Sequence, residues 1–228
     1  MSNSRLRLLF LLASILCVSD AKANIAYSTL LPGNVFDTGG GDAIEGATYP
    51  GPNPESIADA FVPTVSGDLT IIDVAVTSQQ LSFLPTIPDN HFQLDLFANS
   101  SAGGPDTDII LASGIITAPT TGTLETFTYS GPSLDLIAGQ TYWLALSPTQ
   151  SDTFGAWCFS SPTVLSTLPI YFSTDGGSTY MAELGGGPAD AFSIDVEAVP
   201  EPESYMLLFG GLVALGLMKF RFCGSKSA

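Results

Sequence analysis

The sequence predicts an all-β protein: an antiparallel β-sandwich of jelly-roll-like type, with a signal helix before it and a transmembrane helix after it. Three observations carry this prediction. Only 12% of the residues are charged, fewer than the exposed faces of amphipathic helices need. Apolar and polar residues alternate in several short runs, and clusters of turn-forming residues separate these runs.

Residues 1–23 have the three parts of a secretory signal peptide. Two arginines precede an apolar run from residue 8 to residue 18, and small residues at Ala21 and Ala23 fit a signal-peptidase site. The apolar run is shorter than the about 20 residues that a membrane-spanning helix needs, which argues against an uncleaved anchor. We therefore expect export, with Asn24 as the first residue after cleavage.

Residues 24–198 are predicted to form one acidic β-sandwich ectodomain. Alternation with a period of two is typical of strands that face a core on one side. The clearest runs are Ile72, Val74 and Val76; Phe92, Leu94 and Leu96; Tyr142, Leu144 and Leu146; and Phe192, Ile194 and Val196. Glycine-containing turns between such runs predict about nine or ten strands, enough to enclose a core. The glycines at 39–41 and the prolines at 50–54 predict that residues 33–56 are mostly loop.

Residues 199–228 are predicted to be a sorting and anchoring segment. Pro200, Glu201 and Pro202 form an extended spacer, because proline fixes its own backbone angle and disfavours helix in the residue before it. The apolar stretch that follows predicts a transmembrane helix at about residues 205–222, whose terminal basic side chains can reach the interface. Positive charge after this helix places its end in the cytoplasm and the ectodomain outside.

This order of a Pro-Glu-Pro motif, a glycine-punctuated apolar helix and terminal basic residues resembles the PEP-CTERM sorting signal of Gram-negative bacteria. The resemblance implies that an exosortase, a membrane processing enzyme of species that make exopolysaccharide, recognises Pro200, Glu201 and Pro202. The usual terminal cluster of arginines is reduced here to Lys219 and Arg221. A plain single-pass anchor is the alternative interpretation.

Three segments of the middle domain resemble the choice-of-anchor domains that often precede such signals. They are residues 57–63, the strand at 92–97 with the Gly-Gly-Pro loop after it, and residues 136–146, which contain the sequence Ala-Gly-Gln-Thr-Tyr-Trp. The resemblance implies a non-enzymatic extracellular module and supplies no binding residue.

The distribution of charge separates the middle domain from both ends of the chain. All six Lys and Arg residues lie in the terminal segments, whereas 21 of the 22 acidic residues lie between Ala23 and Met218. The carboxylates of this domain therefore have no Lys or Arg of their own domain as partners. Such a surface repels polyanions, so the sequence excludes nucleic acid as a partner.

Enzymatic activity is not expected. His91 is the single histidine, and the Gly-x-Ser-x-Gly pattern of a nucleophile elbow does not occur. Cys158 has apolar neighbours and no basic residue near it in the sequence, so we expect burial to raise the pKa of its thiol and keep it unreactive. Carboxylate pairs such as Asp95 and Glu125 occur in any acidic β protein and do not indicate a glycosidase.

No cofactor is expected, with calcium as the one open alternative. Oxygen-rich loops could supply calcium ligands from Asp37, Asp42, Asp106, Asp108 and Asp175. None of these loops fits an EF-hand or a nonapeptide repeat. The competing interpretation is a solvated acidic surface whose aspartates form turns.

Together these features predict a non-catalytic protein of the cell surface or extracellular matrix, associated with exopolysaccharide or biofilm. Its expected partners are signal peptidase, an exosortase-type enzyme, the membrane through the C-terminal helix, and exopolysaccharide. It would be anchored in the envelope or released after C-terminal processing. The alternative is a carbohydrate-binding module, calcium-dependent for an acidic sugar, because five aromatic residues could stack on sugar rings: Tyr49, Trp143, Trp157, Tyr171 and Tyr180.

Overall fold

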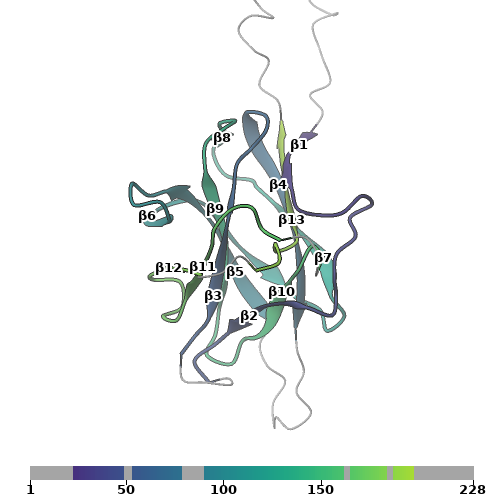
Figure 1. Ribbon diagram of the computed structural model, residues 1–228, viewed down its shortest axis with the longest axis vertical. Coiled ribbons are helices and arrows are strands. Elements are labelled where there is room, and N and C mark those ends of the chain that lie inside the picture. Colours follow the sequence, from purple (N-terminus) through teal and green to yellow (C-terminus); the bar gives the residue numbers. More distant parts are fainter. Residues whose placement is uncertain (1–22, 49–52, 79–89, 162–164, 184–186, 198–228) are drawn as a thin grey trace, which may run out of the picture.

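The computed structural model describes residues 23–48, 53–78, 90–161, 165–183 and 187–197, and this part of the chain is all-β (Figure 1). Its strands form two antiparallel sheets that face one another as in a β-sandwich. The predicted signal helix, the predicted transmembrane helix and the Pro-Glu-Pro motif lie outside the described residues, as does Ala21. Among the described residues, no helix is long and apolar enough to cross a membrane.

The first sheet is built around the long strand β4. Its order is β1-β13-β4-β10-β2, and β7 and β8 also pair with β4. The strands are β1 (Ala23–Ser28), β2 (Gly41–Glu45), β4 (Gly67–Ser78), β7 (Thr123–Thr128), β8 (Asp135–Leu136), β10 (Phe154–Cys158) and β13 (Phe192–Glu197). β13 pairs with residues 68–74 of β4 and β10 with residues 76–78, so these two strands follow one another along β4.

The second sheet has the order β12-β11-β3-β9-β5-β6, and every neighbouring pair is antiparallel. Its strands are β3 (Ser56–Phe61), β5 (His91–Asn99), β6 (Pro105–Thr117), β9 (Tyr142–Pro148), β11 (Ile170–Ser173) and β12 (Met181–Ala182). The chain crosses repeatedly between the two sheets, which brings segments that are distant in sequence into one core.

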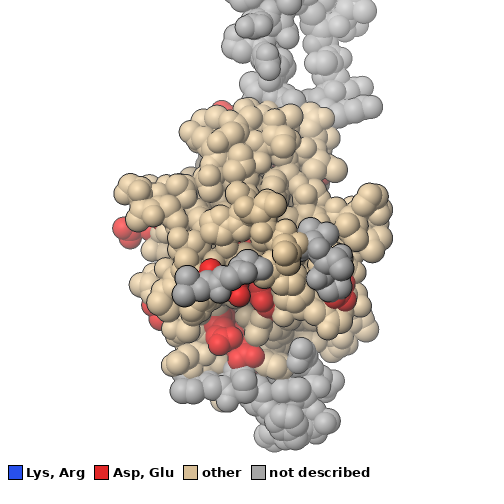
Figure 2. Space-filling view, in the orientation of Figure 1, with Lys and Arg blue, Asp and Glu red and all other residues tan. Residues whose placement is uncertain are grey.

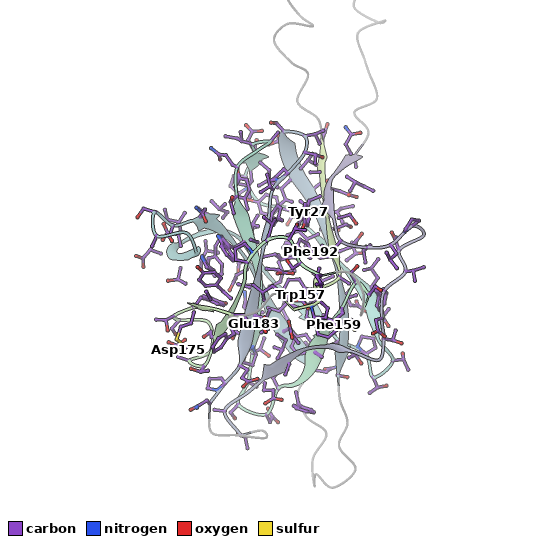
Figure 3. The ribbon with its side chains drawn as sticks, in the orientation of Figure 1. Tyr27, Trp157, Phe159, Asp175, Glu183 and Phe192 are labelled. Carbon is purple, nitrogen blue, oxygen red and sulfur yellow. The ribbon has the colours of Figure 1, made fainter. Side chains whose placement is uncertain are left out.

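The core between the sheets contains all four runs that alternate in the sequence, which confirms the period-two prediction. Burial of each large apolar side chain contributes about 1.5–3 kcal/mol to folding. Aromatic rings line the centre of the core: Phe192 lies 5.3 Å from Tyr27 and 5.6 Å from Trp157 between ring centroids (Figure 3). The indole nitrogen of Trp157 donates a hydrogen bond to the carbonyl of Ala191, 3.1 Å away, so its polar atom is satisfied inside the core.

A second apolar cluster lies on the outer face of the second sheet. It contains Ala58, Ala60, Phe97, Trp143 and Ala145, and the side chains of Leu168, Tyr171 and Tyr180 pack on it. The strands β3 and β9 are therefore buried on both faces. This double burial explains why the sequence around them is apolar almost without interruption.

The N-terminal region has more strand than the sequence predicts. Residues 41–45, which fall in the predicted loop, form β2 and pair with β10. Gly41 pairs with Cys158, and a Cβ atom at Gly41 would overlap the backbone carbonyl of Trp157, so this glycine permits close strand pairing instead of forming a turn. The described residues contain thirteen strands instead of nine or ten, partly because β8 and β12 have two residues each.

The described chain begins and ends at the same edge of the sandwich. Ala23 pairs with Glu197, and Asn24 pairs with Val196. β1 and β13 lie side by side in Figure 1 and end together at the top of the view.

Candidate functional site

Two aspartates face one another in the interior of the sandwich. Asp59 lies in the middle of β3. It points inward, because every second residue of a strand lies on the same face and Ile57 and Phe61 are core residues. Asp190 lies two residues before Phe192 and faces the same interior from the first sheet. Asp59 is 1% exposed and Asp190 is 0% exposed. The backbone N–H of Asp190 donates a hydrogen bond to Asp59 Oδ2 at 3.2 Å, which joins the two sheets at this point.

Most oxygens of this pair have no hydrogen-bond partner among the described residues. These are Oδ1 of Asp59 and both carboxyl oxygens of Asp190. Burial raises the pKa of Asp59 well above its usual value. The hydrogen bond from the Asp190 N–H is the next largest cause and lowers this pKa, while the nearby Asp42 and Glu183 raise it by less. Burial likewise raises the pKa of Asp190, and the neighbouring Asp59 is the next largest cause of this increase. Leaving a buried polar group unpaired is costly, and far more so when it is charged.

Two further carboxylates lie at the edge of this pair. Asp42 on β2 is directly opposite Trp157 on β10, and directly opposed residues share a face, so Asp42 points toward the core side. Burial, followed by Glu183, raises the pKa of Asp42 to about 6. Glu183 follows β12 and donates its N–H to the carbonyl of Ile170 at 2.9 Å, and Ile170 pairs with Asp59. We call Asp42, Asp59, Glu183 and Asp190 the acidic cluster.

A pocket opens beside the acidic cluster between β2 and the second sheet. Its volume is about 260 Å³, and it is lined by Asp42, Glu55, Ile57, Phe172, Ser173 and Glu183. Red carboxylates gather in the lower half of Figure 2, near β2 and β3. Figure 3 labels one residue from each sheet in this region: Glu183 from the second sheet and Trp157, opposite Asp42, from the first. Three carboxylates thus line one opening, and no Lys or Arg occurs among the described residues to neutralise them.

The structure does not bring the five predicted calcium ligands together. Asp37, Asp106 and Asp175 each accept a backbone N–H from their own turn, from Gly39, Asp108 and Thr179 respectively. Only Asp42 belongs to the acidic cluster. Within the described residues, no three His, Cys, Asp or Glu side chains already stand in a metal-ligating arrangement. The interpretation of these aspartates as turn formers fits three of the five positions.

Asp175 is the clearest of these turn aspartates. Its carboxylate accepts hydrogen bonds from the hydroxyls of Thr179 and Ser173, at 2.6 Å and 2.7 Å, and from the Thr179 N–H at 2.8 Å. These bonds, with the Thr179 hydroxyl as the largest cause, lower the pKa of Asp175 to about 2. Its oxygens already hold the turn between β11 and β12.

The candidate catalytic residues lie in different sheets. His91 begins β5 in the second sheet and is exposed, whereas Cys158 ends β10 in the first sheet and is fully buried against Ala75 and Ala191. Burial, followed by the effect of Asp37, raises the pKa of the Cys158 thiol to about 11. The prediction of a raised thiol pKa is therefore confirmed.

The two tryptophans considered for sugar stacking are not available at the surface. Trp143 is 1% exposed and Trp157 is 0% exposed. Trp143 donates its indole N–H to Asn99 Oδ1 at 2.8 Å and packs edge-on against Tyr171. Tyr49 lies outside the described residues. Tyr171 and Tyr180 are half-buried and pack on the outer apolar cluster. A sugar bound to the described part of this chain would therefore have to be held by groups other than the tryptophans.

Three members of the acidic cluster were not predicted from the sequence. The signal for Asp59 is present: it is a charged residue at an inward position of the apolar run 57–61. Asp190 and Glu183 carry no comparable signal, because only the pairing of distant strands brings them to Asp59.

Comparison with known proteins gives no family for this chain. No protein-family model matches it, and no curated protein matches it. The resemblances to a sorting signal and to choice-of-anchor domains therefore rest on the residues alone.

Proposed function

We propose that this chain is an exported, non-catalytic β-sandwich protein of the cell envelope, sorted by a PEP-CTERM-type signal. The observation that carries the proposal is the separation of charge: the sandwich contains no Lys or Arg, and all six basic residues lie in the two membrane-directed ends. Lys and Arg next to an apolar segment hold that side of the segment in the cytoplasm, so basic residues confined to the two ends favour export of the body between them with a cytoplasmic tail.

The position of the two ends supports the same proposal. Because Asn24 pairs with Val196, both terminal segments leave the sandwich from one edge. A helix inserted in the membrane after this edge would hold that end of the sandwich near the bilayer. Asp190 lies seven residues before Glu197, so the acidic cluster would stand roughly 20 Å farther from the membrane.

The topology and the site chemistry support a structural or interaction role. The chain passes repeatedly between the two sheets, which favours the jelly-roll-like interpretation of the sandwich. The one described cysteine is buried and the one histidine lies in the other sheet, which supports a protein without nucleophilic catalysis. Exopolysaccharide is the proposed environment, and an exosortase-type enzyme that recognises Pro200, Glu201 and Pro202 is the proposed processing partner.

Mass spectrometry of the protein recovered from the envelope and the medium tests this proposal. We expect a mature chain that begins at Asn24 and has lost the helix after the Pro-Glu-Pro motif. Replacing Pro200, Glu201 and Pro202 by alanine should leave the C-terminal segment attached, whereas the neighbouring change Glu203→Gln should not. Recovery of an intact, soluble chain inside the cell would contradict export, and equal processing of both variants would contradict recognition of the motif.

Carbohydrate binding is the second candidate, and the pocket beside the acidic cluster is the observation that favours it. With the described tryptophans buried, a bridging cation at the three carboxylates of the pocket would hold the sugar hydroxyls. A glycan array probed with calcium and with chelator tests this. Calcium-dependent binding would support it, and no binding in either condition would exclude it for the glycans on the array.

A further inference from the structure

The acidic cluster gathers carboxylates from both sheets of the sandwich. Asp42 and Asp190 belong to the first sheet, and Asp59 and Glu183 to the second. Packed sheets lie about 10 Å apart, so short carboxylate side chains that point inward from opposite sheets meet near the middle. The hydrogen bond from the backbone N–H of Asp190 to Asp59 Oδ2 shows that the Asp59 side chain reaches across to the segment that carries Asp190.

Three oxygens inside this cluster have no hydrogen-bond partner in the described part of the chain, although they belong to side chains that are at most 1% exposed. A buried carboxylate is ordinarily paired with a base, hydrogen-bonded or bound to a metal. Among the described residues there is no Lys or Arg. Asp59 pairs with Leu144, which pairs with Leu96, so the exposed His91 lies five residues away along β5. Within the described chain, Asp59 and Asp190 therefore have no basic side chain to pair with.

We propose that the acidic cluster binds one calcium ion between the two sheets, with Asp59 and Asp190 as buried ligands and Asp42 and Glu183 as ligands on the pocket side. The inference goes beyond the proposed export and envelope role and does not depend on how the chain is sorted. It assigns Asp59, Glu183 and Asp190 to a metal site and keeps one of the ligands expected from the sequence.

Calcium fits this donor set better than other cations. It takes six to eight oxygen ligands in variable geometry, and four carboxylates can supply up to eight oxygens. Magnesium demands a near-ideal octahedron and keeps several waters, and soft metals prefer Cys and His. The neighbouring pocket of about 260 Å³ has room for several waters, at about 30 Å³ each, to complete the coordination.

Binding would draw the two outer carboxylates toward the buried pair. Asp42 is half-buried and Glu183 is exposed, so both side chains can turn toward the ion. Asp42 lies on β2, the edge strand of the first sheet, and Glu183 follows β12, the edge strand of the second. The ion would thereby tie together the two sheet edges that border the pocket.

Terbium luminescence on the full-length protein in mild detergent is the direct test. Terbium replaces calcium at oxygen sites and emits when a nearby indole is excited, and Trp157 is directly opposite Asp42. After treatment with chelator at neutral pH, we expect one saturable terbium site per chain. Calcium should displace the ion and magnesium should do so much less well. For an extracellular module, calcium affinity is expected at about 10⁻⁴–10⁻³ M.

Matched variants connect the signal to the cluster. Asp59→Asn and Asp190→Asn keep side-chain size and remove one charge each, and we expect each to weaken terbium binding about tenfold or more. Asp108→Asn makes the same charge change at an exposed position outside the cluster and should leave binding unchanged. If a buried variant fails to fold, Asp42→Asn on the half-buried side replaces it.

Melting curves give a second, independent measure. In chelator, Asp190→Asn should melt at a higher temperature than the original chain, because a buried charge is removed. In millimolar calcium the melting temperature of the original chain should rise above its value in chelator, whereas that of Asp190→Asn should rise little or not at all. The proposal is overturned if the original chain shows no saturable site and no response to calcium, which would mean that the buried carboxyls are protonated instead. It is equally overturned if Asp108→Asn abolishes binding as strongly as Asp190→Asn.

Discussion

At the scale of single residues, aspartates in this protein have opposite environments. Asp175 is exposed and accepts three hydrogen bonds, which lower its pKa to about 2. Asp59 and Asp190 are buried with unpartnered oxygens, and burial raises the pKa of both. Local hydrogen-bond donors and solvent access therefore decide what each carboxylate does, and residue type alone does not.

Replacing Asp175 tests its role in the turn between β11 and β12. We expect Asp175→Ala to lower the free energy of unfolding by about 1–2 kcal/mol through lost hydrogen bonds, measured by urea denaturation at pH 7. Because the pKa of Asp175 is lowered, its contribution is present above its unfolded value near 4 and is lost as the pH falls toward about 2. The control Asp152→Ala removes an exposed carboxylate elsewhere and should change stability little. Equal effects of the two variants would contradict the assigned role.

The sequence predicts the inward faces of strands well and the acidic cluster poorly. Ile72, Val74 and Val76 alternate because every second residue of a strand meets the core, a rule that needs no partner strand. Asp59 and Asp190 are 131 residues apart, and only the packing of two sheets brings them together. The sequence therefore could not show that these two side chains meet. It does show one signal, which is that Asp59 is a charged residue with apolar neighbours.

At the scale of elements, β2 shows how a glycine-rich segment can pair closely with a neighbour. Its first residue, Gly41, lies so near β10 that any side chain would meet the backbone of Trp157. A glycine cluster in the sequence indicates either a turn or such an approach, and the structure distinguishes Gly39 in the loop from Gly41 in the strand. This strand also carries Asp42, so its pairing positions one side of the acidic cluster.

Two glycine substitutions test this assignment. Gly41→Ala should lower the free energy of unfolding by about 1–3 kcal/mol, because the backbone carbonyl of Trp157 cannot move away without breaking the pairing of β2 and β10. Gly39→Ala has only an ordinary contact, 3.4 Å from Asp37 Oδ1, and should stay within about 0.5 kcal/mol. Urea denaturation measures both. Tolerance of Gly41→Ala would mean that β2 does not pair as described.

At the scale of the whole molecule, the carboxylates of the sandwich repel one another, because no Lys or Arg among the described residues offsets their charge. Three pairs of neighbouring acids illustrate this: Asp59 with Asp190, Glu45 with Glu55, and Asp195 with Asp73. Burial, followed by Glu55, raises the pKa of Glu45 to about 7. The net charge of −16 therefore acts against the compact state unless protons, salt or bound cations reduce it.

The pH dependence of stability follows from the raised pKa values of these carboxyl groups. A carboxyl group whose folded pKa is raised stabilises the fold fully below its unfolded value and loses that contribution as the pH rises through the folded value. In chelator, the melting temperature should therefore fall as the pH rises from about 5 through 7, given the pKa of Glu45 near 7. Glu45→Gln should flatten the upper part of this curve. A melting temperature that rises over the same interval would contradict this account.

Salt gives a complementary prediction. Where only repulsion is present, screening removes an unfavourable term, so sodium chloride should raise the melting temperature in chelator. A protein stabilised by surface ion pairs would respond in the opposite direction. Scanning calorimetry over a series of salt concentrations distinguishes the two responses.

Native mass spectrometry of the protein recovered from outside the cytoplasm tests the central claim most directly, because one mass reports both the ends of the chain and a bound ion. In millimolar calcium, the account predicts a chain that begins at Asn24 and carries one calcium ion, which chelator removes and which Asp190→Asn does not bind. A chain from this fraction that still begins at Met1, or one that binds no calcium, would contradict it.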